Sequence, residues 1–119
     1  MVELRMTTLN EIEALENNVK RAKESVELGS ALDRLRTNRD FKKIITEGYF
    51  RDEAVRLVHL KSDSNSQSEV MQSSIVKQMD SIGALAQYFY VVSHRAAMAS
   101  RSIAVDEETL TELMTEEVQ

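Results

Sequence analysis

Apolar residues in the first third of the chain recur at alternating spacings of three and four positions. The series is Ile12, Leu15, Val19, Ala22, Val26 and Gly29. Such alternation places side chains on one stripe of an α-helix and is typical of a coiled-coil seam. Just before it, Thr8 and Glu11 have the spacing of a capping box, in which each side chain satisfies a free backbone N–H at a helix start. The pattern therefore predicts a long helix from Thr8, with residues 1–7 flexible.

A second series with similar spacing lies in the second half of the chain. It consists of Ile75, Met79, Ile82, Ala86, Phe89, Ser93 and Ala96. Ser66 and Glu69 again have capping-box spacing, so we expect a second long helix that starts there. Two long seams can cover each other, which favours an antiparallel pair of helices. A second copy of the chain could also complete either seam, so a homo-oligomer is an open alternative.

The helical period is interrupted between the two series. A short helix that carries Phe41 is expected to end at Gly48, because glycine adopts the left-handed conformation of a helix C-cap without a Cβ penalty. Tyr49 and Phe50 would then fold back onto the core. A second short helix is predicted over residues 54–60, where apolar residues are concentrated.

Residues 62–68 contain no apolar side chain and are predicted to be a linker between the two helical halves. Little else interrupts helix, because the 119 residues include three glycines and no proline. We therefore predict an all-α fold with a single domain over residues 8–104. Two long antiparallel amphipathic helices would have two short helices at the turn. The side chains expected to define this fold are Phe41, Gly48, Tyr49, Phe50, Leu57, Ile82 and Phe89.

The C-terminal segment 105–119 is acidic and contains no basic residue, so the net charge of −5 resides there and the rest of the chain is close to neutral. Leu110, Leu113 and Met114 share one helical face within it. We expect a short helix that a partner protein orders, although docking of the same side chains on the chain's own body is an equal alternative. Tyr90 is a further interface candidate, because three consecutive aromatic residues on a helix cannot all enter one core.

Residue types that carry out catalysis are sparse. His59 and His94 are far apart and lack the spacing of a metal-binding pair. There is no cysteine, which excludes disulfides and thiolate metal sites. We therefore predict a non-enzymatic protein without cofactor, metal or small-molecule substrate. No segment approaches the ~18 consecutive apolar residues of a membrane span, so no membrane partner is expected.

One cluster of side chains is basic. Its members are Arg34, Arg36, Arg39, Lys42 and Lys43. These residues could contact phosphates, so a helical nucleic-acid-binding module is an alternative function. The sequence pI of about 5.1 makes nucleic acid the less favoured partner. The acidic tail would also compete for the same basic surface.

Positions on both sides of the expected turn carry a resemblance to known proteins. The run Asn38–Leu60, Leu32 and Leu35 before it, and the segments Ile82–Leu85 and Gln87–Phe89 after it resemble a group of small helical proteins of tailed bacteriophages. The resemblance covers about two thirds of the chain and involves helix-packing positions. It implies a place in the head and structural gene neighbourhood of a phage.

We therefore expect a structural or assembly protein that docks through helix faces onto viral structural proteins. It could be a capsid-associated, scaffold-like or neck component, made in the host cytoplasm and then carried in the virion. The alternative is a small phage regulatory protein that binds a host or viral enzyme through its acidic tail, whose charge would mimic nucleic acid.

Overall fold

The structure, a computed structural model, describes the backbone of residues 2–118 and the side chains of residues 5–116. Helices dominate this range and no strand occurs within it, which confirms the predicted all-α fold. The two long helices are α1 (Val2–Thr37) and α4 (Glu69–Val118). Between them lie α2 (Arg39–Phe41), η1 (Lys42–Glu53), α3 (Ala54–Ser62) and η2 (Ser64–Ser66).

The chain forms two compact units. The first consists of Met1–Ser30 with Val92–Gln119, and the second is Ala31–Val91. Each unit is a helical hairpin, and α1 and α4 contribute residues to both.

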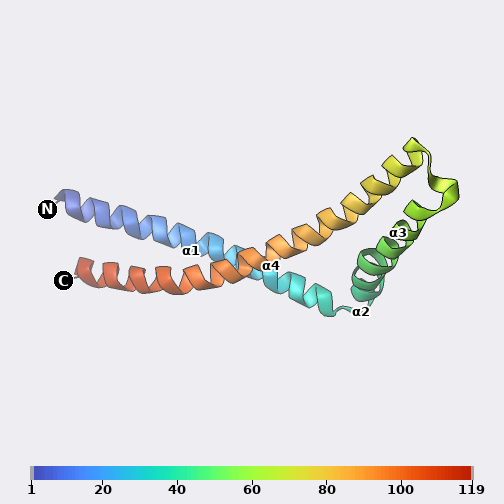
Figure 1. The fold of residues 1–119 in the computed structure, drawn as a ribbon. Helices are drawn as coiled ribbons and strands as arrows, with labels where there is room; N and C mark the ends of the chain where they lie inside the picture. Colours follow the sequence, from blue (N-terminus) through green and yellow to red (C-terminus); the bar gives the residue numbers. More distant parts are fainter. Residues whose placement is uncertain (1, 119) are drawn as a thin grey trace. The chain divides into compact units, whose positions relative to one another are not determined.

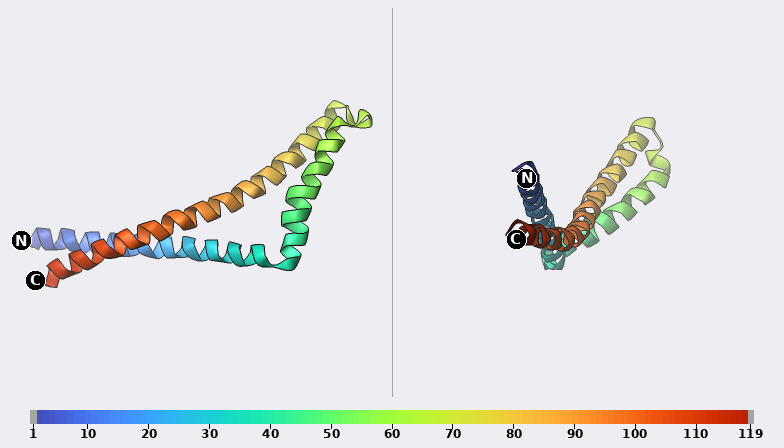
Figure 2. Two further views of the ribbon diagram at one scale, coloured as in Figure 1. Left: turned by 60° about the horizontal axis from the view of Figure 1, so that its bottom comes forward. Right: turned by 90° about the vertical axis from the view of Figure 1, so that its left-hand side faces the viewer.

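In the first unit, α1 and the C-terminal part of α4 run side by side in opposite directions (Figures 1 and 2). All six predicted seam positions of α1 are buried or half-buried, as expected of a coiled coil. The facing stripe on α4 also alternates between steps of four and three. It consists of Val92, Ala96, Ala99, Ile103, Asp106, Leu110 and Leu113.

The two helices approach each other closely at Gly29. A Cβ atom added to this buried glycine would overlap the Cβ of Ala96. Farther along the hairpin, Lys23 Nζ and Glu107 Oε1 form an exposed ion pair at 3.4 Å.

The start of α1 differs from the prediction. The helix begins at Val2, so residues 2–7 are helical, and Thr8 lies inside the helix rather than at its cap. Met1 lies outside the described residues. Helix formation by residues 2–7 lengthens α1 at its N-terminal end.

The second unit packs the stretch from Arg39 to Ser62 against the first turns of α4 (Figure 1). Leu57 and Ile75 are fully buried at its centre, next to Ile82. Partly buried side chains surround these three: Tyr49, Phe50, Ala54, Leu60 and Met79. Apolar residues of two helices thus make one narrow core.

Two predictions for this unit were wrong. The helical backbone continues through Gly48, and no glycine in the described part of the chain has a positive φ angle, so Gly48 is not a left-handed C-cap. Tyr49 and Phe50 therefore reach the core from within a helix instead of from a turn. The two short helices expected at the turn form a single uninterrupted helical stretch from Arg39 to Ser62.

The middle of this stretch, η1, is a π-helix. In a π-helix each backbone N–H bonds to the carbonyl five residues earlier, which widens the helix to about 4.4 residues per turn. Half-buried side chains of this stretch include Phe41, Ile45, Tyr49 and Phe50. At Gly48, an added Cβ would lie 2.8 Å from the carbonyl oxygen of Lys43. Glycine therefore fits this point of the wide helix better than any larger residue.

The predicted linker at residues 62–68 is an ordered turn. Glutamine amides hold it, since Gln72 Nε2 donates to the carbonyls of Lys61 (2.9 Å) and Ser66 (2.8 Å). Gln67 Nε2 donates to the carbonyls of Lys61 (3.0 Å) and Asp63 (2.6 Å). Ser68 rather than Ser66 caps α4, because its Oγ accepts a hydrogen bond from the N–H of Met71 at 3.2 Å.

The acidic segment is not a separate element. It forms the last turns of α4, which continues without a break to Val118. Asp106, which has a residue type typical of helix starts, lies in the middle of α4 and is half-buried in the seam. None of the helices, over the range that the structure describes, is both long and apolar enough to cross a membrane.

Candidate functional site

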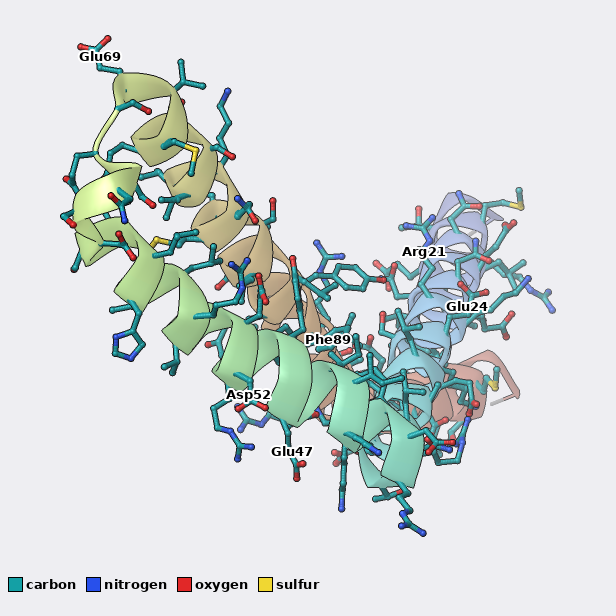
Figure 3. All side chains as sticks on the ribbon, turned by 90° about the vertical axis from the view of Figure 1, so that its right-hand side faces the viewer. Arg21, Glu24, Glu47, Asp52, Glu69 and Phe89 are labelled. Carbon is teal, nitrogen blue, oxygen red and sulfur yellow. The ribbon has the colours of Figure 1, made fainter. Side chains whose placement is uncertain are left out.

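Three phenylalanine rings gather in the second unit where η1 faces α4. The ring centroids of Phe50 and Phe89 are 5.6 Å apart in an edge-to-face arrangement, and those of Phe41 and Phe89 are 5.9 Å apart. All three rings are half-buried. Figure 3 shows Phe89 on α4 directly beside η1, while Glu47 and Asp52 project from η1 toward solvent.

The wide helix is what brings two of these rings together. Phe41 and Phe50 are nine positions apart. In an α-helix nine residues make about two and a half turns, which would place the two side chains on opposite faces. At the wider spacing of a π-helix they make about two turns, so both side chains reach Phe89.

Hydrogen bonds at the end of α1 fix where this stretch begins. The backbone N–H of Asn38 donates to the carbonyl of Leu35 at 3.0 Å. The side chain of Asn38 then caps the next helix by accepting a hydrogen bond from the N–H of Phe41 at 2.9 Å. Phe41 and its neighbour Lys42 thereby take defined positions at the first turn.

The three rings line a pocket of about 440 Å³, which we call the Phe pocket. It is lined by Arg36, Phe41, Lys42, Thr46, Glu47, Phe50 and Phe89. The guanidinium carbon of Arg36 lies 5.9 Å from the centroid of the Phe89 ring, within the range of a cation–π contact. The pocket therefore offers an occupant both apolar and charged contacts.

A second, more polar pocket of about 450 Å³ shares two residues with the first. Its lining consists of Thr37, Arg39, Lys42, Lys43 and Glu47. Four of the five basic residues predicted to contact phosphates thus line one or both pockets, whereas Arg34 lines neither. We call Arg39, Lys42 and Lys43 the basic rim.

Ion pairs on the surface follow the basic rim along the helix. Arg51 pairs with Asp52 at 3.0 Å, and the resulting hydrogen bond raises the pKa of the Arg51 guanidinium. A hydrogen bond from Arg56 lowers the pKa of the Glu53 carboxyl. Exposed pairs of this kind contribute little stability, so they are local features of the surface.

The structure separates the four predicted partner-interface residues into two groups. Leu110 is buried and Leu113 half-buried in the seam with α1, which is the arrangement expected when the tail docks on the chain's own body. Met114 and Tyr90 are exposed. Leu110 and Leu113 thus contribute to the core of the first unit.

Another surface of α4 was missed by the sequence reasoning. Met98 and Val105 are seven positions apart and more than half exposed, on a face away from the seam. Glu108 and Glu112 follow Val105 at steps of three and four and are also exposed. We call these four residues the acidic ridge. Their heptad-like spacing is visible in the sequence, but the sequence analysis considered only the seam positions of this helix.

Metal-binding side chains do not cluster in the described part of the chain: no three histidine, aspartate or glutamate residues there could hold an ion together. His59 and His94 are both exposed. No family model, curated protein or solved structure matches this chain.

Proposed function

We propose that this protein is a non-enzymatic structural or assembly component of a tailed bacteriophage, which docks through helix faces onto a larger viral assembly. The observation that carries the proposal is the large number of big apolar side chains that stay exposed on both hairpins. In the second unit they are Leu35, Ile44, Val55, Val58, Val70, Met71, Val76, Tyr88 and Tyr90. In the first they are Met6, Leu9, Leu28, Met98, Val105 and Met114.

The architecture accounts for this exposure. Two helices in contact bury one stripe each, so any second apolar stripe faces water until another surface covers it. Exposed apolar residues that are grouped, rather than scattered, are typical of interaction surfaces. Met98 and Val105 on the acidic ridge form one such group, and Val55 and Val58 on α3 form another.

The resemblance of residues 38–60, together with segments around Leu32 and Phe89, to small helical phage proteins supports the viral part of the proposal. A protein of this kind acts by helix-face docking, in which apolar side chains enter grooves on the partner. The proposed location is therefore the virion, and the proposed partners are viral structural proteins.

Quantitative mass spectrometry of purified phage particles tests this function. A fixed copy number that matches the symmetry of a capsid or neck is the expected result. Absence of the chain from particles, together with its recovery on a host or viral enzyme, would overturn the proposal. A non-structural phage protein of similar size, measured in the same particle preparation, controls for contamination.

One observation favours a second candidate, the small regulatory protein. Glu108, Glu112 and Glu116 are exposed along one side of α4, as a surface that mimics nucleic acid would require. This regulator would bind an enzyme and be missing from mature particles. Neutralising Glu108 and Glu112 together would abolish its binding to that enzyme.

A further inference from the structure

The Phe pocket has the features of a docking site that a helix surface could fill. Its lining combines three phenylalanine rings with charged side chains, and its volume of about 440 Å³ exceeds that of one side chain. Neither Lys42 nor Lys43 forms an ion pair within the part of the chain that the structure describes, and both are exposed. An occupant that presents an apolar group next to carboxylates would satisfy both parts of the site.

The acidic ridge offers the same chemistry in the complementary arrangement. Val105 is 61% exposed, and Glu108 and Glu112 lie on its side of the helix. Arg101 is an exposed basic residue beside the ridge, on the same side of α4, just as Glu47 is an acidic residue among the cations of the pocket. Apolar, acidic and basic groups on the ridge thus each have a counterpart at the pocket.

We propose that the Phe pocket and basic rim of one copy of this protein bind the acidic ridge of a second copy. Val105 enters the pocket against the phenylalanine rings, and Met98, about two turns earlier on the same face of α4, packs next to the pocket. Glu108 and Glu112 face Lys42 and Lys43. The inference rests on the proposed function, because it names the way in which an assembly protein contacts its own copies.

Two physical effects would drive this contact. Burial of Val105 and Met98 removes exposed apolar surface from water. Methionine is well suited to such a site, because its sulfur packs favourably near aromatic rings. The opposite charges of rim and ridge favour the encounter of two copies and fix their relative orientation. Salt weakens this electrostatic attraction.

The contact is between two different surfaces, so each copy has one of each. Such heterologous contacts close into rings or continue as open chains, depending on the rotation between copies. Both outcomes give repeated copies, as an assembly protein requires.

Sedimentation velocity over a range of protein concentrations tests the proposal. The wild type is expected to self-associate, with affinity falling at least about tenfold when salt rises from roughly 0.05 to 0.5 M. The rim variant K42E/K43E and the ridge variant E108K/E112K should each have an affinity for self-association that is lower by a similar factor or more. K20E/R21E and E13K/E16K change the same number of charges on the exposed face of α1 and should associate as the wild type does.

Mixing the two defective variants gives the most specific result. The rim variant keeps an intact ridge, the ridge variant keeps an intact rim, and the two reversed surfaces are again opposite in charge. An equal mixture should therefore associate with the two variants in equal numbers, although neither variant associates alone. A single chain that carries all four reversed charges should again self-associate. Val105→Ser should weaken association, whereas Val70→Ser, at another exposed valine, should not.

A monomeric wild type at all concentrations, with all variants folded by circular dichroism, would overturn the inference. It would also be overturned if the wild type bound a fluorescent single-stranded oligonucleotide through Lys42 and Lys43 without self-associating. These results are independent of the proposed function, since a chain found at fixed copy number in particles could still be monomeric in solution.

Discussion

The two hairpins solve the same packing problem with different helices. In the first unit, the seam positions of α1 and α4 repeat at three and four residues, and Gly29 lets the helices approach at Ala96. In the second, η1 is a wide π-helix, and Phe41 and Phe50, nine positions apart, both reach Phe89. The regular hairpin makes a uniform seam, whereas the wide one gathers aromatic rings and leaves a pocket. A change of helical period therefore turns a packing surface into a candidate binding site.

Leu57→Ala should produce the largest loss of stability and should act in the second unit. Leu57 is completely buried against Ile75 and Ile82, so its truncation removes apolar contacts and leaves a cavity, at a cost of about 2–5 kcal/mol. Urea unfolding followed by circular dichroism measures the change. Val58→Ala, at an exposed neighbour on the same helix, serves as the control and should change stability by less than about 1 kcal/mol. Equal effects at the two positions would contradict the narrow core described for this unit.

Gly29→Ala tests the close approach in the first unit. The added methyl group overlaps Ala96, so the helices must separate, and the cost of such overpacking is about 1–3 kcal/mol before the better helix propensity of alanine offsets part of it. Thermal unfolding gives the net effect. Gly29→Ala combined with Ala96→Gly should recover most of the loss, because the second change removes the methyl group in the way. If the double variant did not recover stability, the strain would not come from the contact between residues 29 and 96.

Gly48→Ala addresses the wide helix directly. Its Cβ would meet the Lys43 carbonyl, which is main chain and cannot move aside without changing the hydrogen bonds of the π-helix. We expect destabilisation of about 1 kcal/mol or more. Hydrogen exchange of the amides in residues 42–53 should rise, while exchange in the first unit stays unchanged. Uniform loss of protection in both hairpins would show that the two units are energetically coupled.

Gly83→Ala should have a smaller effect of opposite sign. Nothing lies within 4 Å of the added Cβ, and Gly83 is exposed in the interior of α4. Alanine favours helix over glycine by about 1 kcal/mol, so the variant should be more stable by up to that amount. A raised melting temperature is the readout. Destabilisation would mean that another surface packs closely on Gly83.

The smallest expected effect concerns pH. The hydrogen bond from Arg56 lowers the pKa of Glu53, so the pair stabilises the folded chain above the ordinary pKa of glutamate. This contribution disappears as pH falls through the lowered value. Both side chains are near the surface, so the change is slight. Glu53→Gln should differ from the wild type in stability near neutral pH and match it more closely near about pH 3. Urea unfolding measures the stability, and Glu13→Gln serves as the control. A difference that grew on acidification would contradict the sign of the shift.

Sequence periodicity predicted the α1 side of the first unit well and the second unit poorly. The series from Ile75 to Ala96, which was expected to cover α1, instead packs mainly in the second unit. The seam from Ile12 to Gly29 was found in full, because its steps of three and four match an α-helix. Around Phe41 and Phe50 the same test failed, and the loss of the α-helical period was interpreted as a turn at Gly48. A turn and a π-helix both interrupt that period, and glycine suits both, so the pattern alone could not separate them.

The candidate site shows the same division. The basic residues were recognised from their density in the sequence, but the Phe pocket depends on a helix width that no local rule supplied. The buried state of Leu110 was one of two alternatives that the sequence left open. Leu110 is buried because it lies on the side of α4 that α1 covers. Which side α1 covers depends on contacts between residues far apart in the chain.

The wide helix also has a genetic consequence. Because η1 places about 4.4 residues in each turn, its twelve residues complete roughly the number of turns that ten would complete in an α-helix. Codons could therefore be deleted from or inserted into this stretch while the helix stays continuous. The helical segments on either side would keep the same faces toward their neighbours. Relatives of this chain are expected to differ in length between residues 42 and 53, and those with shorter versions should lack the Phe pocket.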